Sequence, residues 1–207
     1  MSRIVMPIGI DVEKVKNVFG CKDETLYHQL LNSDFFKKFD EEFSFKTELY
    51  NILFNYVSIE NRGIKPAKFF GLIKGNDGRR LEGDWNDYGY ALLTICCYLG
   101  EKLSKDDTEF VYGHSWWQIN TLLRENRSSI DLSRMLESKP IFDTPFEYDD
   151  IYTNIYNKKE IIEFYAHLLN IEKDVKEENL VLFYSLKKGV LNCVDKNLDL
   201  VIFSHEI

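Results

Sequence analysis

The segment 87–103, DYGYALLTICCYLGEKL, most constrains what this chain can fold into. Its apolar residues recur at helical spacing and surround nearly the whole circumference of the helix that they predict. At about 100° of rotation per residue, only Asp87, Thr94 and Glu101 share a polar line, and these three are expected to face water. A helix this apolar is predicted to be buried at the centre of a domain.

The rest of the chain predicts a mostly helical α+β domain around that helix, with a small sheet. Three segments favour strands: Arg3–Ile10, Ile151–Tyr156 and 198–204, so the sheet includes the N-terminal and C-terminal strands. The remaining helices are predicted at 12–19, 24–33, 44–62, 65–74, 115–126, 131–138, 158–170 and 177–197. Residues 181–184, VLFY, could instead form a strand, and the periodicity does not decide between the two.

Helix starts are marked by capping residues. Asp11, Asp23 and Ser44 precede helical patterns in which they can accept the first free backbone N–H groups. Asn157 with Glu160, and Ser115 with Gln118, have the spacing of a capping box.

Length and net charge limit the domain organisation and the kinds of partner that fit this chain. A chain of 207 residues fits a single domain over 1–207. The 26 Lys and Arg against 34 Asp and Glu give a net charge of −8, which disfavours nucleic-acid binding because phosphate contacts need clustered cations. The acidic surface favours solubility, and it is also complementary to a basic partner.

Cysteine usage and hydropathy indicate the compartment. No apolar run approaches the roughly 18 residues of a membrane span, and the N-terminus lacks a signal-peptide pattern. None of the four cysteines lies in a CxxC spacing. The sequence therefore predicts a reduced, cytoplasmic protein that does not act at a membrane.

No motif in the chain assigns a catalytic residue, a metal site or a cofactor. The histidines do not lie at zinc-binding helical spacing, and the glycines of the 74–80 loop, KGNDGRR, do not match a phosphate-binding loop. That loop is nevertheless basic, and His114 stands next to a predicted helix start. A small-ligand or catalytic site near His114, Arg79 and Arg80 is therefore the alternative hypothesis.

The candidates for partner binding are one aromatic and a set of carboxylates. Trp116 lies on the apolar stripe of its predicted helix, whereas Trp117 lies about 100° away from it, so Trp117 either fills a second contact or stands partly exposed. Tryptophan is enriched at binding hot spots. The acidic candidates, in two clusters, are Asp106, Asp107, Glu147, Asp149 and Asp150.

The pattern as a whole, with its YGYAL…LGE helix and terminal LDLVIF strand, resembles the uncharacterised bacterial YfbM-like proteins and related domains of unknown function. This resemblance implies a bacterial, soluble, single-domain α+β protein and carries over no catalytic residue.

Two functions remain open. The favoured hypothesis is a non-enzymatic protein-binding role, such as an immunity or antitoxin-like protein that binds a basic effector through an acidic surface. The alternative is an enzyme or small-ligand-binding protein with a site near His114 and the 74–80 loop. The sequence leaves the oligomeric state open.

Overall fold

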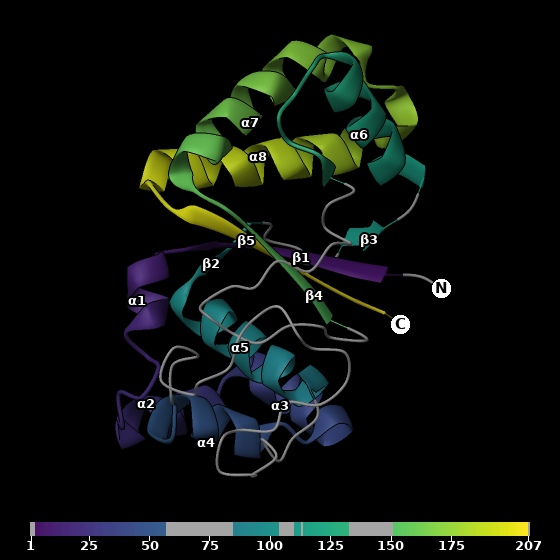
Figure 1. Cartoon of the computed structure of the whole chain (residues 1–207). Helices are drawn as coiled ribbons and strands as arrows, with labels where there is room; N and C mark the ends of the chain where they lie inside the picture. The colour runs from purple at the N-terminus through teal and green to yellow at the C-terminus, as the bar shows by residue number, and fades with distance from the viewer. Residues whose placement is uncertain (1–2, 57–84, 104–109, 113, 133–150, 207) are drawn as a thin grey trace, which may run out of the picture.

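The chain forms a sheet that lies between two layers of helices (Figure 1). The computed structural model describes residues 3–56, 85–103, 110–112, 114–132 and 151–206. Within these residues five strands form one antiparallel sheet in the order β2-β1-β5-β4, and β3 also pairs with β1. Helices α1 to α5 lie on one side of the sheet, and α6, α7 and α8 lie on the other. The predicted α+β class, with the N-terminal and C-terminal strands in the sheet, is confirmed.

The strands are β1 (Arg3–Ile10), β2 (Glu101–Lys102), β3 (Phe110–Tyr112), β4 (Ile151–Tyr156) and β5 (Asp199–Glu206). The helices of the first layer are α1 (Val12–Lys16), α2 (Glu24–Leu31), α3 (Asp34–Phe43), α4 (Lys46–Phe54) and α5 (Trp85–Leu99). The second layer contains α6 (His114–Glu125), α7 (Lys158–Ile171) and α8 (Leu180–Lys196). Two 3-10 turns, η4 (Glu172–Asp174) and η5 (Glu177–Asn179), join α7 to α8.

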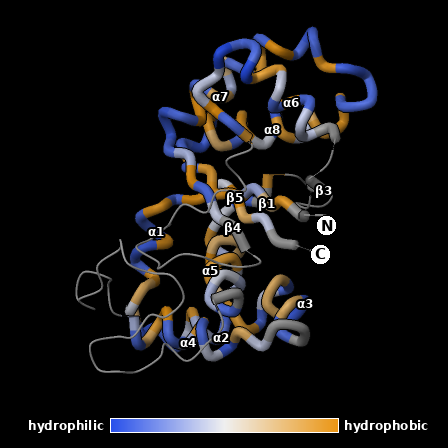
Figure 2. Tube along the Cα trace, turned by 45° about the vertical axis from the view of Figure 1, so that its right-hand side comes forward, coloured by the Kyte–Doolittle hydropathy of each residue, from blue (hydrophilic) through white to orange (hydrophobic). Residues whose placement is uncertain are grey.

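The central strands divide the apolar core into two parts, one under each helix layer. Successive side chains of a strand point to opposite faces. In β5, Val201 and Phe203 belong to the core beneath α1 to α5, whereas Leu200 and Ile202 belong to the core beneath α6 to α8. Figure 2 shows apolar residues gathered where the two helix layers meet the sheet. Both faces of the sheet are therefore covered by helices.

Helix α5 is buried as predicted, but its end and its polar line differ from the prediction. The helix ends at Leu99, not at residue 103, because Gly100 is followed by β2, which pairs with β1. Leu103 therefore lies outside the helix, in the core of the opposite layer. Thr94 is fully buried rather than exposed, and its hydroxyl donates to the carbonyl oxygen of Tyr90 at 2.9 Å. Thr94 can be buried because this backbone carbonyl satisfies its hydroxyl, whereas Asp87 on the same line is only half-buried.

Helix predictions in three other places were wrong: at α3, at the junction of α3 with α4, and at the start of α6. Helix α3 was not predicted, although Ser33 caps it by accepting the Phe36 N–H. Ser44 is not an N-cap but the left-handed C-cap of α3, and α4 ends at Phe54 instead of residue 62. Helix α6 begins at His114, so Ser115 lies inside it and cannot cap it. The first two errors concern the short stretch where α3 ends and α4 begins, whereas the third concerns the step from β3 into α6.

The remaining cap predictions are confirmed. Asp11 and Asp23 accept the first backbone N–H groups of α1 and α2, and Asn157 with Glu160 forms a complete capping box at α7. Residues 181–184 are helical and belong to α8. The predicted helix at 65–74, and the one at 131–138 beyond its first two residues, lie outside the described residues. No helix in the described part of the chain is both long and apolar enough to cross a membrane.

Candidate functional site

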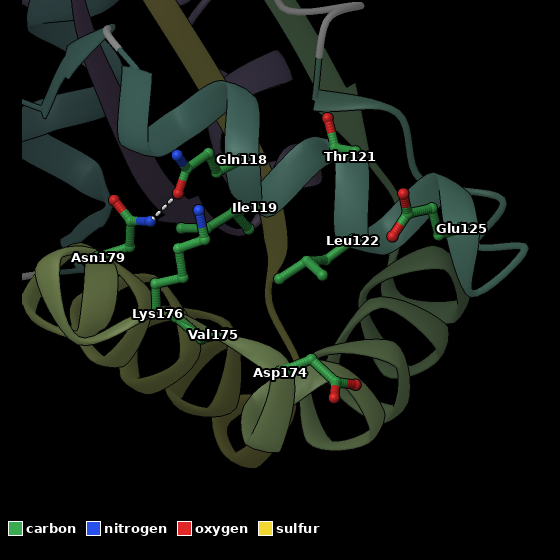
Figure 3. Close-up of a pocket in the computed structure, with 9 residues that line it drawn as sticks. All are labelled: Gln118, Ile119, Thr121, Leu122, Glu125, Asp174, Val175, Lys176 and Asn179. Atoms are coloured by element: carbon green, nitrogen blue, oxygen red, sulfur yellow. Dashed lines mark hydrogen bonds between the residues drawn. The ribbon is translucent and has the colours of Figure 1, made fainter.

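A cavity of about 260 Å³ opens on the second helix layer, between α6 and the two 3-10 turns that join α7 to α8 (Figure 3). It is partly open to solvent. Nine residues line it: Gln118, Ile119, Thr121, Leu122, Glu125, Asp174, Val175, Lys176 and Asn179.

One wall of the cavity is a flank of the amphipathic helix α6. Its innermost side chains, Trp116, Ile119 and Leu123, are fully buried in the core and hold the helix in place. Residues at positions i, i+4 and i+7 share one face of a helix, and Gln118, Leu122 and Glu125 have this spacing. They form the flank next to the core and face the cavity.

The opposite wall is the short linking segment 172–179. Helix α7 runs directly into η4, and Lys187 of α8 holds that turn through an ion pair with Glu172 at 2.7 Å. The chain then becomes extended at Val175 and enters η5. A segment tied at this turn can present Asp174, Val175 and Lys176 to α6 in a defined order.

The cavity has an apolar floor and two polar ends of different character. Ile119 is fully buried, and Leu122 and Val175 are partly buried against the same core. Figure 3 shows Lys176 on the side of Gln118 and Asn179, whereas Glu125 and Asp174 lie toward the other side. The site therefore offers a cation and amides at one end and two carboxylates at the other.

Asn179 joins the two walls at the amide end. It is only 2% exposed, and its Nδ2 donates a hydrogen bond to Oε1 of Gln118. Its own Oδ1 is buried and accepts no hydrogen bond within the described structure. A buried carbonyl without a donor costs free energy, so this amide is held in place by the fold and by Gln118 rather than by its own full set of hydrogen bonds.

Trp117 lies next to this cavity on α6. Its side chain is 45% exposed, which confirms the second of the two predicted possibilities, partial exposure. Thr121, one turn later on the same side of the helix, lines the cavity and donates a hydrogen bond to the carbonyl oxygen of Trp117 at 2.9 Å. An exposed indole therefore stands one helical turn from an open cavity.

The other predicted site residues have no described side chains in the structure. Arg79, Arg80, Asp106, Asp107, Glu147, Asp149 and Asp150 lie outside the described residues. His114 is the first residue of α6, but its side chain is also outside what the structure describes. The cavity residues were missed because Glu125 and Asp174 come from distant segments, and no sequence pattern links them.

The buried thiols do not suit nucleophilic chemistry. Burial raises the pKa of the Cys96 thiol well above its usual value, and burial raises that of Cys193 to about 12. A thiol attacks as its thiolate, so neither cysteine is activated. Among the described residues, no group of three histidine, cysteine or carboxylate side chains is arranged to hold a metal ion.

Comparison with known proteins identifies a family but no activity. A family model described as "Domain of unknown function (DUF7691)" matches residues 1–205. The chain belongs to this family. No curated protein matches the chain. No solved structure matches it. The DUF7691 match spans both helix layers and the sheet, so the cavity beside α6 lies inside the family domain. The predicted resemblance to YfbM-like proteins stays a prediction.

Proposed function

We propose that this DUF7691 protein is a non-catalytic binding protein whose second helix layer docks a basic partner protein. The observation that carries the proposal is the exposed Trp117 beside an open cavity with an apolar floor. Tryptophan side chains next to pockets contribute much of the binding free energy in protein interfaces. The net charge of −8 supports a basic partner, because opposite charge speeds encounter and disfavours acidic competitors.

The cytoplasm of a bacterial cell is the proposed location. All four cysteines are free, and the exposed Cys21 would be open to oxidation in a disulfide-forming compartment. In its most specific form, the proposal is an immunity or antitoxin-like role. In that form, the partner is a basic toxin encoded beside this gene.

The proposal is tested with the basic product of the neighbouring gene and the full chain. Trp117→Ala is expected to weaken binding at least about tenfold, because a hot-spot side chain is worth more than 1.4 kcal/mol. Tyr98→Ala is the matched control, since Tyr98 is a 40% exposed aromatic of α5 in the opposite helix layer. Isothermal titration calorimetry gives the dissociation constants, and circular dichroism confirms that both variants fold.

Two results would overturn the proposal. One is that the wild-type chain does not bind the neighbouring basic protein. The other is that Trp117→Ala and Tyr98→Ala bind with the affinity of the wild type.

A further inference from the structure

We infer that the cavity beside α6 accepts one basic side chain, a lysine or arginine, from the partner protein. This inference rests on the proposed function and adds the chemistry of the anchor. It is carried by the order of groups along the cavity: an apolar floor with carboxylates toward one end and a cation at the other.

The floor matches the aliphatic part of such a side chain. Ile119, Leu122 and Val175 line the cavity, and Figure 3 shows Leu122 between Lys176 on one side and Glu125 on the other. Lysine and arginine lay their methylene groups along apolar surface while the charged head reaches polar groups. A cavity of about 260 Å³ has room for one side chain of this size rather than for a folded element.

The carboxylate end supplies the charge complement. Glu125 and Asp174 are both exposed, and neither forms an ion pair with any residue that the structure describes. They come from opposite walls of the cavity, so a cation that enters this end lies near a carboxylate of α6 and one of the linking segment. A single exposed ion pair contributes little binding free energy. Two carboxylates near one guanidinium or ammonium group contribute more, because each can accept a charge-assisted hydrogen bond.

Lys176 sets the direction in which the side chain enters. Its ammonium group lies on the side of Gln118 and Asn179, away from Glu125 (Figure 3). Like charges repel, so a basic head group is excluded from that end and directed to the carboxylates. Lys176 therefore determines the orientation of a bound basic side chain. Removal of its charge is expected to strengthen the binding of a cation.

The test uses two probes that differ only in the charged group. Nα-acetyl-lysine amide and Nα-acetyl-norleucine amide share the four-carbon stem, and only the former carries an ammonium group. Each is titrated into the full chain and followed by backbone amide NMR shifts. The lysine probe is expected to shift the signals of Gln118, Leu122 and Val175 and to bind several-fold more tightly than the norleucine probe.

Three variants examine the charges at the cavity. The double variant Glu125→Gln, Asp174→Asn is expected to weaken the lysine probe about three- to tenfold, and Lys176→Gln is expected to strengthen it about two- to threefold. Glu177→Gln is the matched control, because Glu177 is an exposed carboxylate of the same segment that does not line the cavity. These nearly isosteric changes on exposed side chains leave the fold intact.

Equal affinity of the two probes would overturn the inference, as would an unchanged affinity in the double variant. The proposed function and this inference can be rejected independently of each other. If the partner's binding depends on Trp117 but not on Glu125 and Asp174, the binding role stands and the basic anchor is rejected. If the lysine probe behaves as expected but no basic neighbour binds, the cavity chemistry stands and the proposed function is rejected.

Discussion

Gly100 shows how one residue decides where the central helix stops. A Cβ atom placed on it would lie 2.5 Å from the carbonyl oxygen of Cys96 and 2.7 Å from that of Gly9. Both neighbours are backbone atoms, which cannot move aside like the end of a side chain. The chain can therefore leave α5 and pair with β1 directly, at Gly9 opposite Glu101, only because residue 100 has no side chain.

Gly100→Ala is expected to lower the free energy of unfolding by about 1–3 kcal/mol, the usual cost of forcing an extra carbon into a packed site. Urea denaturation followed by circular dichroism measures it. Gly20→Asn serves as the control, because Gly20 has φ +70° and its nearest neighbours are 3.8 Å away, and asparagine tolerates the left-handed region. A Gly100→Ala variant as stable as the wild type would show that β2 can shift away from β1.

Among the elements, α7 begins with a complete capping box. Asn157 accepts hydrogen bonds from the backbone N–H groups of Lys159 and Glu160, and the Glu160 carboxylate accepts the N–H of Asn157 at 2.8 Å. These bonds satisfy donors that have no partner within the helix. The cap also connects β4 to the helix without a loop, which places α7 over the sheet. The linking segment that follows α7 then lies beside α6.

Asn157→Ala is expected to destabilise the protein by about 1 kcal/mol, the typical value of an N-cap. Asn170→Ala is the matched control, because Asn170 is an exposed asparagine inside the same helix and alanine is the better helix former. Thermal unfolding of both variants gives the comparison. The cap has no energetic role if the two variants melt at the same temperature.

At the scale of the whole molecule, two cores share one sheet. Cys96 lies in the core of the first layer and Cys193 in that of the second, and both are fully buried. Strands β1 and β5 contribute side chains to both cores. If one core unfolds, one face of β1 and β5 becomes exposed while the other face still supports the second core. The two cores are therefore expected to unfold together, in a single cooperative transition.

The thiols provide a measurement of this cooperativity. Under native conditions a thiol reagent is expected to label the exposed Cys21 quickly and Cys96 and Cys193 only on unfolding. As urea is raised, Cys96 and Cys193 are expected to become reactive at the same concentration, as mass spectrometry of the labelled peptides reports. Labelling of one at clearly lower urea would mean that the two layers unfold separately.

Local signals identified much of the fold before the structure was known. The strands at both ends of the chain, the burial of α5 and the caps at Asp11, Asp23 and Asn157 depend on residues close in sequence. Helix α3 was not predicted, although Ser33 caps it and Phe36 and Phe39 bury one side of it. The cavity beside α6 could not be foreseen apart from the exposure of Trp117.

The sequence by itself determined which segments are apolar and which residues can cap a helix, because periodicity and backbone hydrogen bonding act over a few residues. The tertiary structure alone decided that α5 ends at Leu99, since that boundary depends on the approach of Gly9 to Gly100. It alone brought Glu125 and Asp174 to one cavity with Lys176 at the other side. Contacts between distant segments depend on how whole elements pack, and no local pattern encodes that packing.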